Sequence, residues 1–329
     1  MNRSEFAARL LLILALLIVV GVPVGIHLTE RDSLLHARVP EKGGWSQQVI
    51  KAQVGVPLKL RMTSDDVIHS FAIGQSDQPA VDIEPGKISE ITLNFDRAGI
   101  YTFYCTRWCG LNHWRMRGTI EVSGDGPSSA KTSAPPLYQV LGLDIDAPHV
   151  AAAIPASIPS AAEGRQIAAA RPELKRFLAR DYYLAHSPSQ LFSELEGTQY
   201  SEAERWAVVA EAWRSNTSPE ELDEGARLFS QNCAACHGEL AGGNGVFAGD
   251  LATAGSASTQ SMSGAEGMAM QAPADLADPQ KILGASPALL QGKILRGGMG
   301  TGMPMWGPIF TEAQTWDLIA YLYSLQFSY

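Results

Sequence analysis

The hydrophobic and polar positions fall into three patterns along the chain. Residues 10–26 are an unbroken uncharged run made mostly of Leu, Ile and Val, and residues 45–123 contain short stretches in which apolar and polar side chains alternate. After residue 200 the apolar side chains instead recur at i, i+3, i+4 and i+7. A period of two is typical of strands and a period near 3.6 of helices. The pattern predicts an apolar N-terminal helix, a strand-rich domain and a helical C-terminal region.

Residues 1–30 are predicted to hold a cytoplasmic N-terminus and a membrane anchor. The apolar run Leu10–Ile26 has nearly the length that spans a bilayer as a helix. A cleaved signal peptide is the alternative, but no small-x-small cleavage motif follows Ile26. Because Arg3 and Arg9 precede the run, the positive-inside tendency puts the N-terminus in the cytoplasm. The expected location is the cytoplasmic (inner) membrane, crossed once, with the remaining chain on the periplasmic or outer side.

Five stretches between residues 45 and 123 have the composition and spacing of strands. Leu58–Met62 and Ile88–Leu93 alternate with period two, and turns rich in Gly and Pro separate the stretches. The predicted strands are Gln47–Val54, Pro57–Thr63, Lys87–Phe95, Gly99–Cys105 and Arg117–Ser123. Several short strands within so few residues predict a small all-β sandwich or barrel.

Residues 124–217 carry no recognisable chemistry. The stretch 124–160 begins with small, polar and Pro-rich sequence and contains further prolines, so it is predicted to be a linker. In residues 161–217 the pattern becomes helical over Glu173–Ala185 and Ser201–Ser215. These residues are predicted to form a helical spacer or a packing extension of the next domain.

Composition and charge exclude one class of function. The net charge is −9, and the acidic excess falls in residues 124–329. No basic cluster or stripe is present, so no nucleic-acid partner is expected. The chain has only four cysteines, and they lie in two close pairs, Cys105/Cys109 and Cys233/Cys236.

The first cysteine pair lies in a stretch rich in soft metal ligands. Between Cys105 and Met116 the chain places two thiols, the imidazole of His113 and a thioether, and His69 lies upstream. Thiolate, imidazole and thioether suit copper, and two cysteines can bridge two copper ions with one histidine for each. The alternatives are a disulfide or half of a zinc site, although zinc takes Met poorly.

The spacing C-x3-C-x3-H-x2-M with an upstream His resembles the copper A motif in subunit II of haem–copper oxidases. The resemblance implies a cupredoxin fold, a Greek-key β-barrel, over residues 45–123. The implied copper ligands are His69, Cys105, Cys109, His113, Met116 and the backbone carbonyl of Arg107. Many relatives carry Glu at the position of Arg107, where its side chain helps to hold magnesium. A cationic side chain cannot ligate magnesium, so that site is not expected here.

The second cysteine pair forms the pentapeptide Cys233-Ala-Ala-Cys236-His237. C-x-x-C-H is the signature of covalent c-type haem attachment, in which two thiols bind the haem and the following imidazole binds its iron. A redox dithiol is the alternative. Glu221–Gln231 is predicted to form an amphipathic helix leading into the motif, and Thr311–Leu325 a helix at the end of the chain.

Residues 218–329 resemble an all-α class I cytochrome c. The resemblance implies that a Met on a late loop is the second axial ligand of one covalent haem c. Met299, Met303 and Met305 compete for this role, and Met303 is preferred because the family usually places the ligand directly before a proline.

The order of the segments resembles subunit II of bacterial cytochrome c oxidases that carry a fused cytochrome. The resemblance implies electron entry from an external donor, such as a soluble cytochrome c or a small copper protein, through haem c and dinuclear copper A to catalytic subunit I. That subunit reduces oxygen to water and translocates protons, so this chain is part of an enzyme but carries no catalytic residues itself. The alternatives are the electron-input subunit of a copper A nitric oxide reductase and a stand-alone membrane-anchored electron shuttle.

Overall fold

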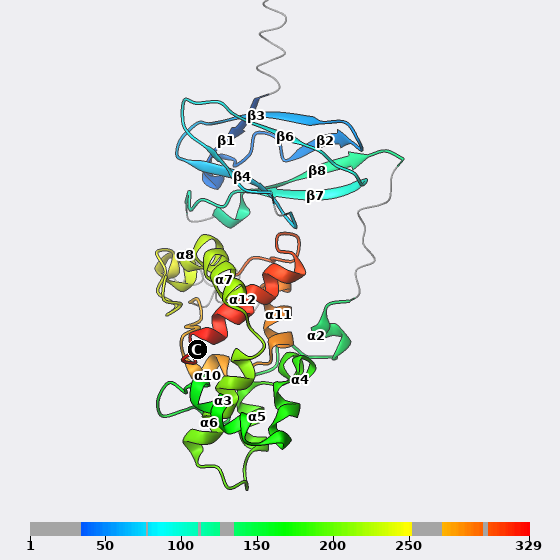
Figure 1. The fold of residues 1–329 in the computed structure, drawn as a ribbon. Coiled ribbons are helices and arrows are strands. Elements are labelled where there is room, and N and C mark those ends of the chain that lie inside the picture. The colour runs from blue at the N-terminus through cyan, green and yellow to red at the C-terminus, as the bar shows by residue number, and fades with distance from the viewer. Residues whose placement is uncertain (1–33, 77, 111–112, 126–134, 252–271, 299–301) are drawn as a thin grey trace, which may run out of the picture. The chain divides into compact units, whose positions relative to one another are not determined.

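The computed structural model describes residues 34–76, 78–110, 113–125, 135–251, 272–298 and 302–329. They form two compact units, one built from strands and the other from helices (Figure 1). Among these residues no helix combines the length and the apolar character of a membrane span. The predicted anchor Leu10–Ile26 lies outside the described residues.

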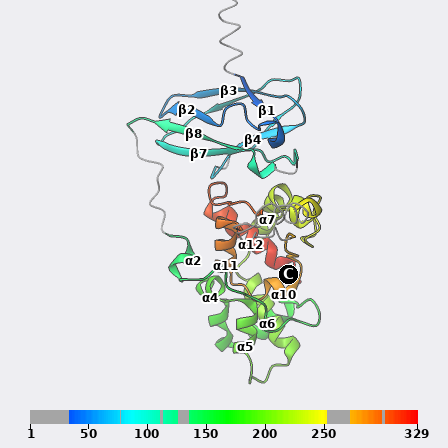
Figure 2. The same ribbon diagram turned by 180° about the vertical axis from the view of Figure 1, so that it is seen from behind.

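The β unit consists of two sheets. The smaller sheet has the order β1 (Leu34–Ala37), β3 (Leu58–Ser64), β6 (Ser89–Leu93), and the larger has the order β2 (Val49–Gln53), β8 (Arg117–Ser123), β7 (Gly99–Tyr104), β4 (His69–Ile73), β5 (Val81–Ile83). Pairs β1/β3 and β2/β8 are parallel, whereas β3/β6, β4/β5 and β7/β8 are antiparallel. Figure 2 shows β3 and β7 in opposite layers. This arrangement fits the cupredoxin-like barrel that the resemblance implies.

Alternating burial explains why the strands form this core. In β3 the side chains of Leu60 and Met62 are buried between partly or fully exposed neighbours, as expected for a sheet with one face in the core. Trp45, Phe71 and Phe103 fill the space between the layers. The Phe71 and Phe103 rings stack with their centroids 5.3 Å apart, and Trp45 meets both edge-on.

All five predicted strands are confirmed, and three more are present. β1 precedes the predicted start of the domain at residue 45, yet it pairs with β3 and its Leu35 and Ala37 are buried. β4 is buried along its whole length, so it has no alternation for a sequence pattern to detect. β1 and β5 span only four and three residues, too few to establish a period.

The longest described helices of the helical unit are α6 (Glu202–Arg214), α7 (Pro219–Asn232) and α12 (Glu312–Ser324). The other elements of this unit are α2 (Leu137–Val140), α3 (Ala161–Ala169), η3 (Pro172–Leu178), α4 (Arg180–Ala185), α5 (Pro188–Glu194), α8 (Ala234–His237), α10 (Pro279–Ile282) and α11 (Pro287–Arg296). Capping boxes at Ser201, Ser218 and Thr311 fix the starts of α6, α7 and α12. These three helices confirm the predictions for their segments.

The predicted helix Glu173–Ala185 is instead two elements. Its first half is the 3-10 helix η3, and an extended residue, Ala179, separates it from α4. Each of the two elements buries an aromatic side chain, Phe177 in η3 and Tyr183 in α4.

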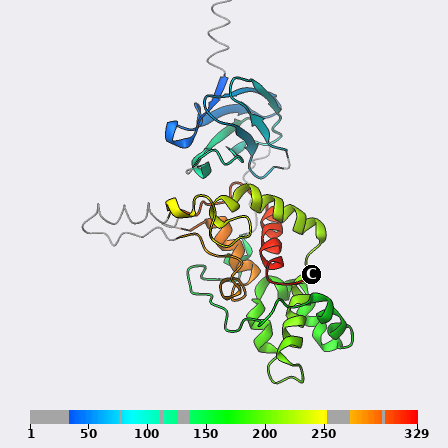
Figure 3. The ribbon, with the colours of Figure 1, turned by 90° about the vertical axis from the view of Figure 1, so that its left-hand side faces the viewer.

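Helices α7 and α12 cross closely beside the cysteine motif (Figure 3). The contact needs Gly225, because a Cβ at this position would overlap the carbonyl oxygen of Asp317. Phe229 and Tyr321 pack across the same crossing with ring centroids 5.3 Å apart. Gly225, Leu228 and Phe229 form the buried face of α7. The helix is therefore amphipathic, as predicted.

The predicted linker and spacer are largely part of the helical unit. Ala161 N–H donates to the carbonyl of Ser328 at 2.9 Å, and Trp213 of α6 lies against Tyr323 of α12 at 5.7 Å between ring centroids. Ala151 N–H donates to the carbonyl of Gln280. Part of the predicted linker 124–160 therefore packs on the last third of the chain. The contacts of Ala161 and Trp213 are those expected of the predicted packing extension at residues 161–217.

Asp317 at the α7/α12 crossing gives a prediction for pH-dependent stability. Burial, together with the negative charges of Glu221 and Glu224, raises its pKa from 3.8 to about 6. As pH rises from about 4 to about 6 the unfolded chain loses this proton while the folded chain keeps it, so stability falls. Asp317→Asn is expected to raise the free energy of unfolding at pH 7 by about 1–2 kcal/mol, after discounting for partial exposure, and to have no effect below about pH 4.

Urea unfolding of the helical unit, followed by haem absorbance and helical circular dichroism at pH 4 and pH 7, measures this difference. The matched control is Glu312→Gln, which removes an exposed acid from the first turn of the same helix and should not produce the gain. An equal gain for Asp317→Asn at both pH values would contradict the prediction.

Candidate metal and haem sites

The predicted copper ligands converge where strands of the larger sheet begin and end. His69 is the first residue of β4, and Cys105 directly follows β7, its neighbour in the sheet. The ligand atoms of His69, Cys105 and Cys109 all lie within 4.8 Å of one another. The backbone N–H of Cys105 donates to the carbonyl of Met116 at 3.1 Å, which holds the two ends of the ligand loop together.

Each cysteine sulfur in this cluster has its own imidazole. His69 Nδ1 lies 3.9 Å from Cys105 Sγ, and His113 Nδ1 lies 3.9 Å from Cys109 Sγ. His69 and Met116 are 0% and 1% exposed. The two cysteines are not joined by a disulfide, which removes that alternative. Two thiols, two imidazoles and a buried thioether fit copper better than zinc, so these residues fit the predicted metal pair.

Asp66 is a functional residue that the sequence reasoning missed. Its Oδ1 lies 2.8 Å from His69 Nε2, so a proton on Nε2 leaves Nδ1 toward Cys105, the arrangement that metal-binding imidazoles need. Its carboxylate also accepts the N–H groups of Val39 and Val67. Burial would raise the pKa of Asp66, but the hydrogen bonds from His69 and the two backbone groups lower it below its ordinary value. The only sequence feature that could have indicated Asp66 is its position three residues before His69.

Ser70 supplies a second contact that the sequence did not indicate. Its backbone N–H donates to Cys105 Sγ at 3.4 Å. Hydrogen bonds to a cysteine sulfur tune the potential of a copper site. Because Ser70 directly follows His69 in β4, one strand places a ligand and a donor to another ligand side by side.

The structure leaves the role of Arg107 as a prediction. Its side chain is exposed on the loop between the two cysteines. The exposure agrees with a role for its backbone carbonyl alone. Leu111 and Asn112, between Cys109 and His113 in the sequence, lie outside the described residues.

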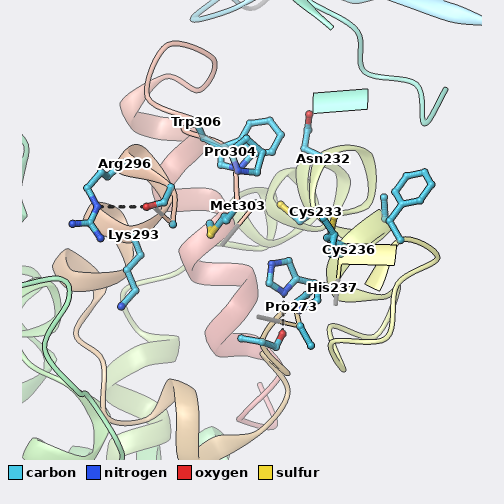
Figure 4. Close-up of a pocket in the computed structure, with 18 of the residues that line it drawn as sticks. Asn232, Cys233, Cys236, His237, Pro273, Lys293, Arg296, Met303, Pro304 and Trp306 are labelled. Atoms are coloured by element: carbon cyan, nitrogen blue, oxygen red, sulfur yellow. Dashed lines mark hydrogen bonds between the residues drawn. The ribbon is translucent and has the colours of Figure 1, made fainter. Parts of the chain in front are cut away.

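The second cysteine pair borders a cavity of about 330 Å³ in the helical unit (Figure 4). Cys233 caps the C-terminal end of α7, and α8 carries Cys236 and His237. Both thiols and the imidazole line the cavity, together with Met303 and other residues of the late loop. Figure 4 shows the His237 ring and the Met303 thioether directed into the same space, as the two axial ligands of a haem must be.

The surroundings of His237 select one form of its ring. Its Nδ1 lies 2.9 Å from the carbonyl of Ala274, so Nδ1 carries the proton and Nε2 is the available ligand atom. Burial lowers the pKa of His237, opposed in part by this hydrogen bond. Ala274 was not identified from the sequence, because 37 residues separate it from His237 and a backbone acceptor has no residue signature.

The structure distinguishes Met303 from Met305 as candidates for the axial haem ligand. Met303 lines the cavity, whereas Met305 is 54% exposed and is not among the lining residues. Met299 lies outside the described residues. Gly297 lets the loop fold over the cavity: it has φ +72°, and a Cβ there would lie 2.6 Å from the carbonyl carbon of Pro304. These observations support Met303 as the axial ligand.

A redox dithiol at the second pair is disfavoured by its surroundings. Burial, reinforced by Cys236, raises the pKa of Cys233 to about 12, and burial also raises the pKa of Cys236. Reactive dithiols instead have lowered pKa values. The adjoining cavity and the imidazole facing it fit a haem.

Comparisons with known proteins give two family matches. Residues 31–123 match the family model "Cytochrome C oxidase subunit II, periplasmic domain", and residues 222–326 match "Cytochrome c". These two matches confirm the family resemblance of the strand-rich and helical parts of the chain. The first match begins before residue 45, in agreement with the position of β1.

The curated relatives are named cytochrome c oxidase subunit 2. One from Thermus thermophilus is 35% identical over 79 residues, which cover 24% of this chain and 58% of the relative. One from Apis mellifera ligustica is 42% identical over 66 residues, 20% of this chain and 29% of the relative. This chain thus spans about half the length of the Thermus relatives and less than a third of the bee protein.

Two solved structures are similar over part of the chain. A chain of a heme-copper terminal oxidase dimer has 22% identity and a TM-score of 0.25, covering 37% of this chain and 100% of its own. The periplasmic domain of subunit II of cytochrome oxidase from Bradyrhizobium japonicum has 26% identity and a TM-score of 0.23, covering 27% and 62%.

Proposed function

We propose that this chain is the electron-entry subunit of a membrane haem–copper oxidase. An external donor, such as a soluble cytochrome c or a small copper protein, would reduce haem c in the helical unit. Electrons would pass to a dinuclear copper A centre in the β unit and then to catalytic subunit I, which reduces oxygen to water. The segment Leu10–Ile26 would anchor the chain in the cytoplasmic membrane, with both units outside.

One observation carries this proposal. The ligand atoms of His69, Cys105 and Cys109 lie within 4.8 Å of one another, on a chain that also holds a C-x-x-C-H motif at a cavity. A pair of cysteine sulfurs with an imidazole beside each fits two copper ions better than one. Two candidate redox sites on one chain suit electron relay.

The residues of the chain perform the binding and tuning. Cys105, Cys109, His69, His113, Met116 and the carbonyl of Arg107 would hold the copper pair, which supplies a one-electron relay when bound. Asp66 fixes the tautomer of His69. In the helical unit Cys233 and Cys236 would attach the haem, and His237 and Met303 would be its axial ligands, a combination that raises the haem potential.

The test is purification of the chain with its natural partners in mild detergent. The complex should contain a multi-helix membrane subunit, and it should consume oxygen when a reduced cytochrome c or copper protein is supplied. Consumption of nitric oxide without oxygen consumption would replace the proposal with a nitric oxide reductase. Recovery of the chain alone would replace it with a membrane-anchored shuttle.

A further inference from the structure

Three charged side chains line the haem cavity away from the cysteine motif. Lys293 and Arg296 come from α11, and Asp146 comes from the segment between α2 and α3. Asp146 lies far before residue 222, where the cytochrome c match begins. A residue outside the cytochrome c domain therefore contributes a negative charge to the wall of the haem cavity.

The segment around Asp146 is fastened to α11 by several contacts. Arg296 donates from both terminal nitrogens to the Asp146 carboxylate, with Nη1 2.6 Å from Oδ2. Lys293 Nζ donates to the carbonyl of Ile145 at 2.7 Å, and the Ile145 side chain is buried. Asp144 accepts the backbone N–H of Asp146, which fixes the turn. The position of the carboxylate is thus set by the fold.

Asp146 is charged under working conditions. The Arg296 guanidinium lowers the pKa of Asp146 below its ordinary value, and Lys293 adds to this effect. Of the two cations on the wall, Arg296 is therefore partly neutralised by Asp146. A fixed negative charge beside a redox centre opposes the gain of an electron, and a fixed positive charge favours it.

We propose that Asp146 lowers the reduction potential of the haem, both by its own charge and by neutralising Arg296. The segment 137–151 would then help to set the reduction potential of the haem, and so the driving force for electron transfer to the copper pair. Asp146 acts here as a positioning and charge-setting residue and not as a ligand. The inference rests on the proposed haem attachment.

The test is a spectroelectrochemical titration of the haem in the full-length purified chain. Asp146→Asn keeps the shape of the side chain and removes its charge. It should raise the midpoint potential, so that the ratio of reduced to oxidised haem at a fixed ambient potential increases by roughly threefold or more. Asp146→Glu keeps the charge and should stay close to the unsubstituted chain.

Glu224→Gln is the matched control. Glu224 also forms a two-pronged pair with an arginine, Arg227, but it does not line the cavity. Its substitution should leave the potential unchanged. Equal upward shifts for Asp146→Asn and Glu224→Gln would overturn the proposal, because they would reflect only the overall charge of the unit.

A purely structural role of the Asp146–Arg296 pair predicts a different result from an effect on the haem potential. If the Asp146–Arg296 pair only fastens the segment, Asp146→Asn lowers the melting temperature and leaves the potential unchanged, which overturns the proposal. Loss of haem from Asp146→Asn but not from Asp146→Glu, with an unshifted potential in any haem retained, also overturns it. Absence of a haem spectrum in the unsubstituted chain would instead refute haem attachment, so the two failures are distinguishable.

Discussion

Cys105→Ser is expected to abolish the electron paramagnetic resonance signal of a mixed-valence copper pair while leaving the haem spectrum of the same chain intact. A serine hydroxyl is a hard, weakly acidic ligand that cannot replace a bridging thiolate between two copper ions. Cys105 Sγ also accepts the N–H of Ser70 and lies beside His69, so the substitution replaces the sulfur in both contacts by a smaller, harder oxygen. The haem motif is in a different unit of the structure and should assemble normally.

The reciprocal control is Cys233→Ser, which removes one of the two thiols for the haem. It should weaken covalent haem attachment and leave the copper signal unchanged. Electron transfer from the haem to a downstream acceptor should fall by orders of magnitude in Cys105→Ser, because the relay has lost its middle site. Survival of the mixed-valence signal in Cys105→Ser would show that the copper assignment is wrong. Parallel loss of the haem spectrum would show a folding defect instead, and Cys109→Ser would then test the same bridge from its other sulfur.

Strands were predictable where one face of a sheet meets solvent. β3 and β6 alternate in sequence because their neighbours outside the core are polar. β4 carries His69, a predicted copper ligand, but is buried throughout, so its sequence has no period of two. The strand that matters most for the metal site was therefore the least visible in the pattern.

The boundary between linker and domain could not be predicted from composition. Residues 137–160 are rich in proline and small side chains, which is typical of linkers, yet they are ordered by backbone hydrogen bonds to residues distant in sequence, such as Ala151 to Gln280. Similarly, Trp213 gave α6 an apolar face, but only the folded chain shows that this face meets α12. Long-range packing leaves no local signature.

Most of the predicted ligands could be proposed from the sequence because they cluster in two short motifs, and only His69 and Met303 lie apart from them. The resemblance implied five side chains of the copper set, and the structure brings the ligand atoms of three of them within 4.8 Å of one another. The groups that orient the ligands were not predictable. Asp66 and the Ala274 carbonyl act through hydrogen bonds to His69 and His237, and hydrogen-bond geometry depends on the fold.

Met303→Ala is expected to abolish the weak long-wavelength absorbance band that accompanies Met ligation of an oxidised haem, and to lower the haem reduction potential. A thioether ligand stabilises the reduced iron, so its loss favours the oxidised form. Met303 lines the cavity with His237, and Gly297 permits the close approach of the following Pro304. The change should be a complete loss of the band, since an alanine methyl group cannot bind iron. Optical spectra of the oxidised chain and a potentiometric titration measure the two effects.

Met305→Ala is the matched control, because Met305 is two residues away but is exposed and lies outside the cavity wall. It should leave both the band and the potential unchanged. An unaltered band in Met303→Ala together with its loss in Met305→Ala or Met299→Ala would transfer the axial role to that residue. Loss of the band in both Met303→Ala and Met305→Ala would show that the whole loop, and not one thioether, determines ligation. Only selective loss in Met303→Ala supports the site as the structure presents it, with one thioether directed into the cavity opposite His237.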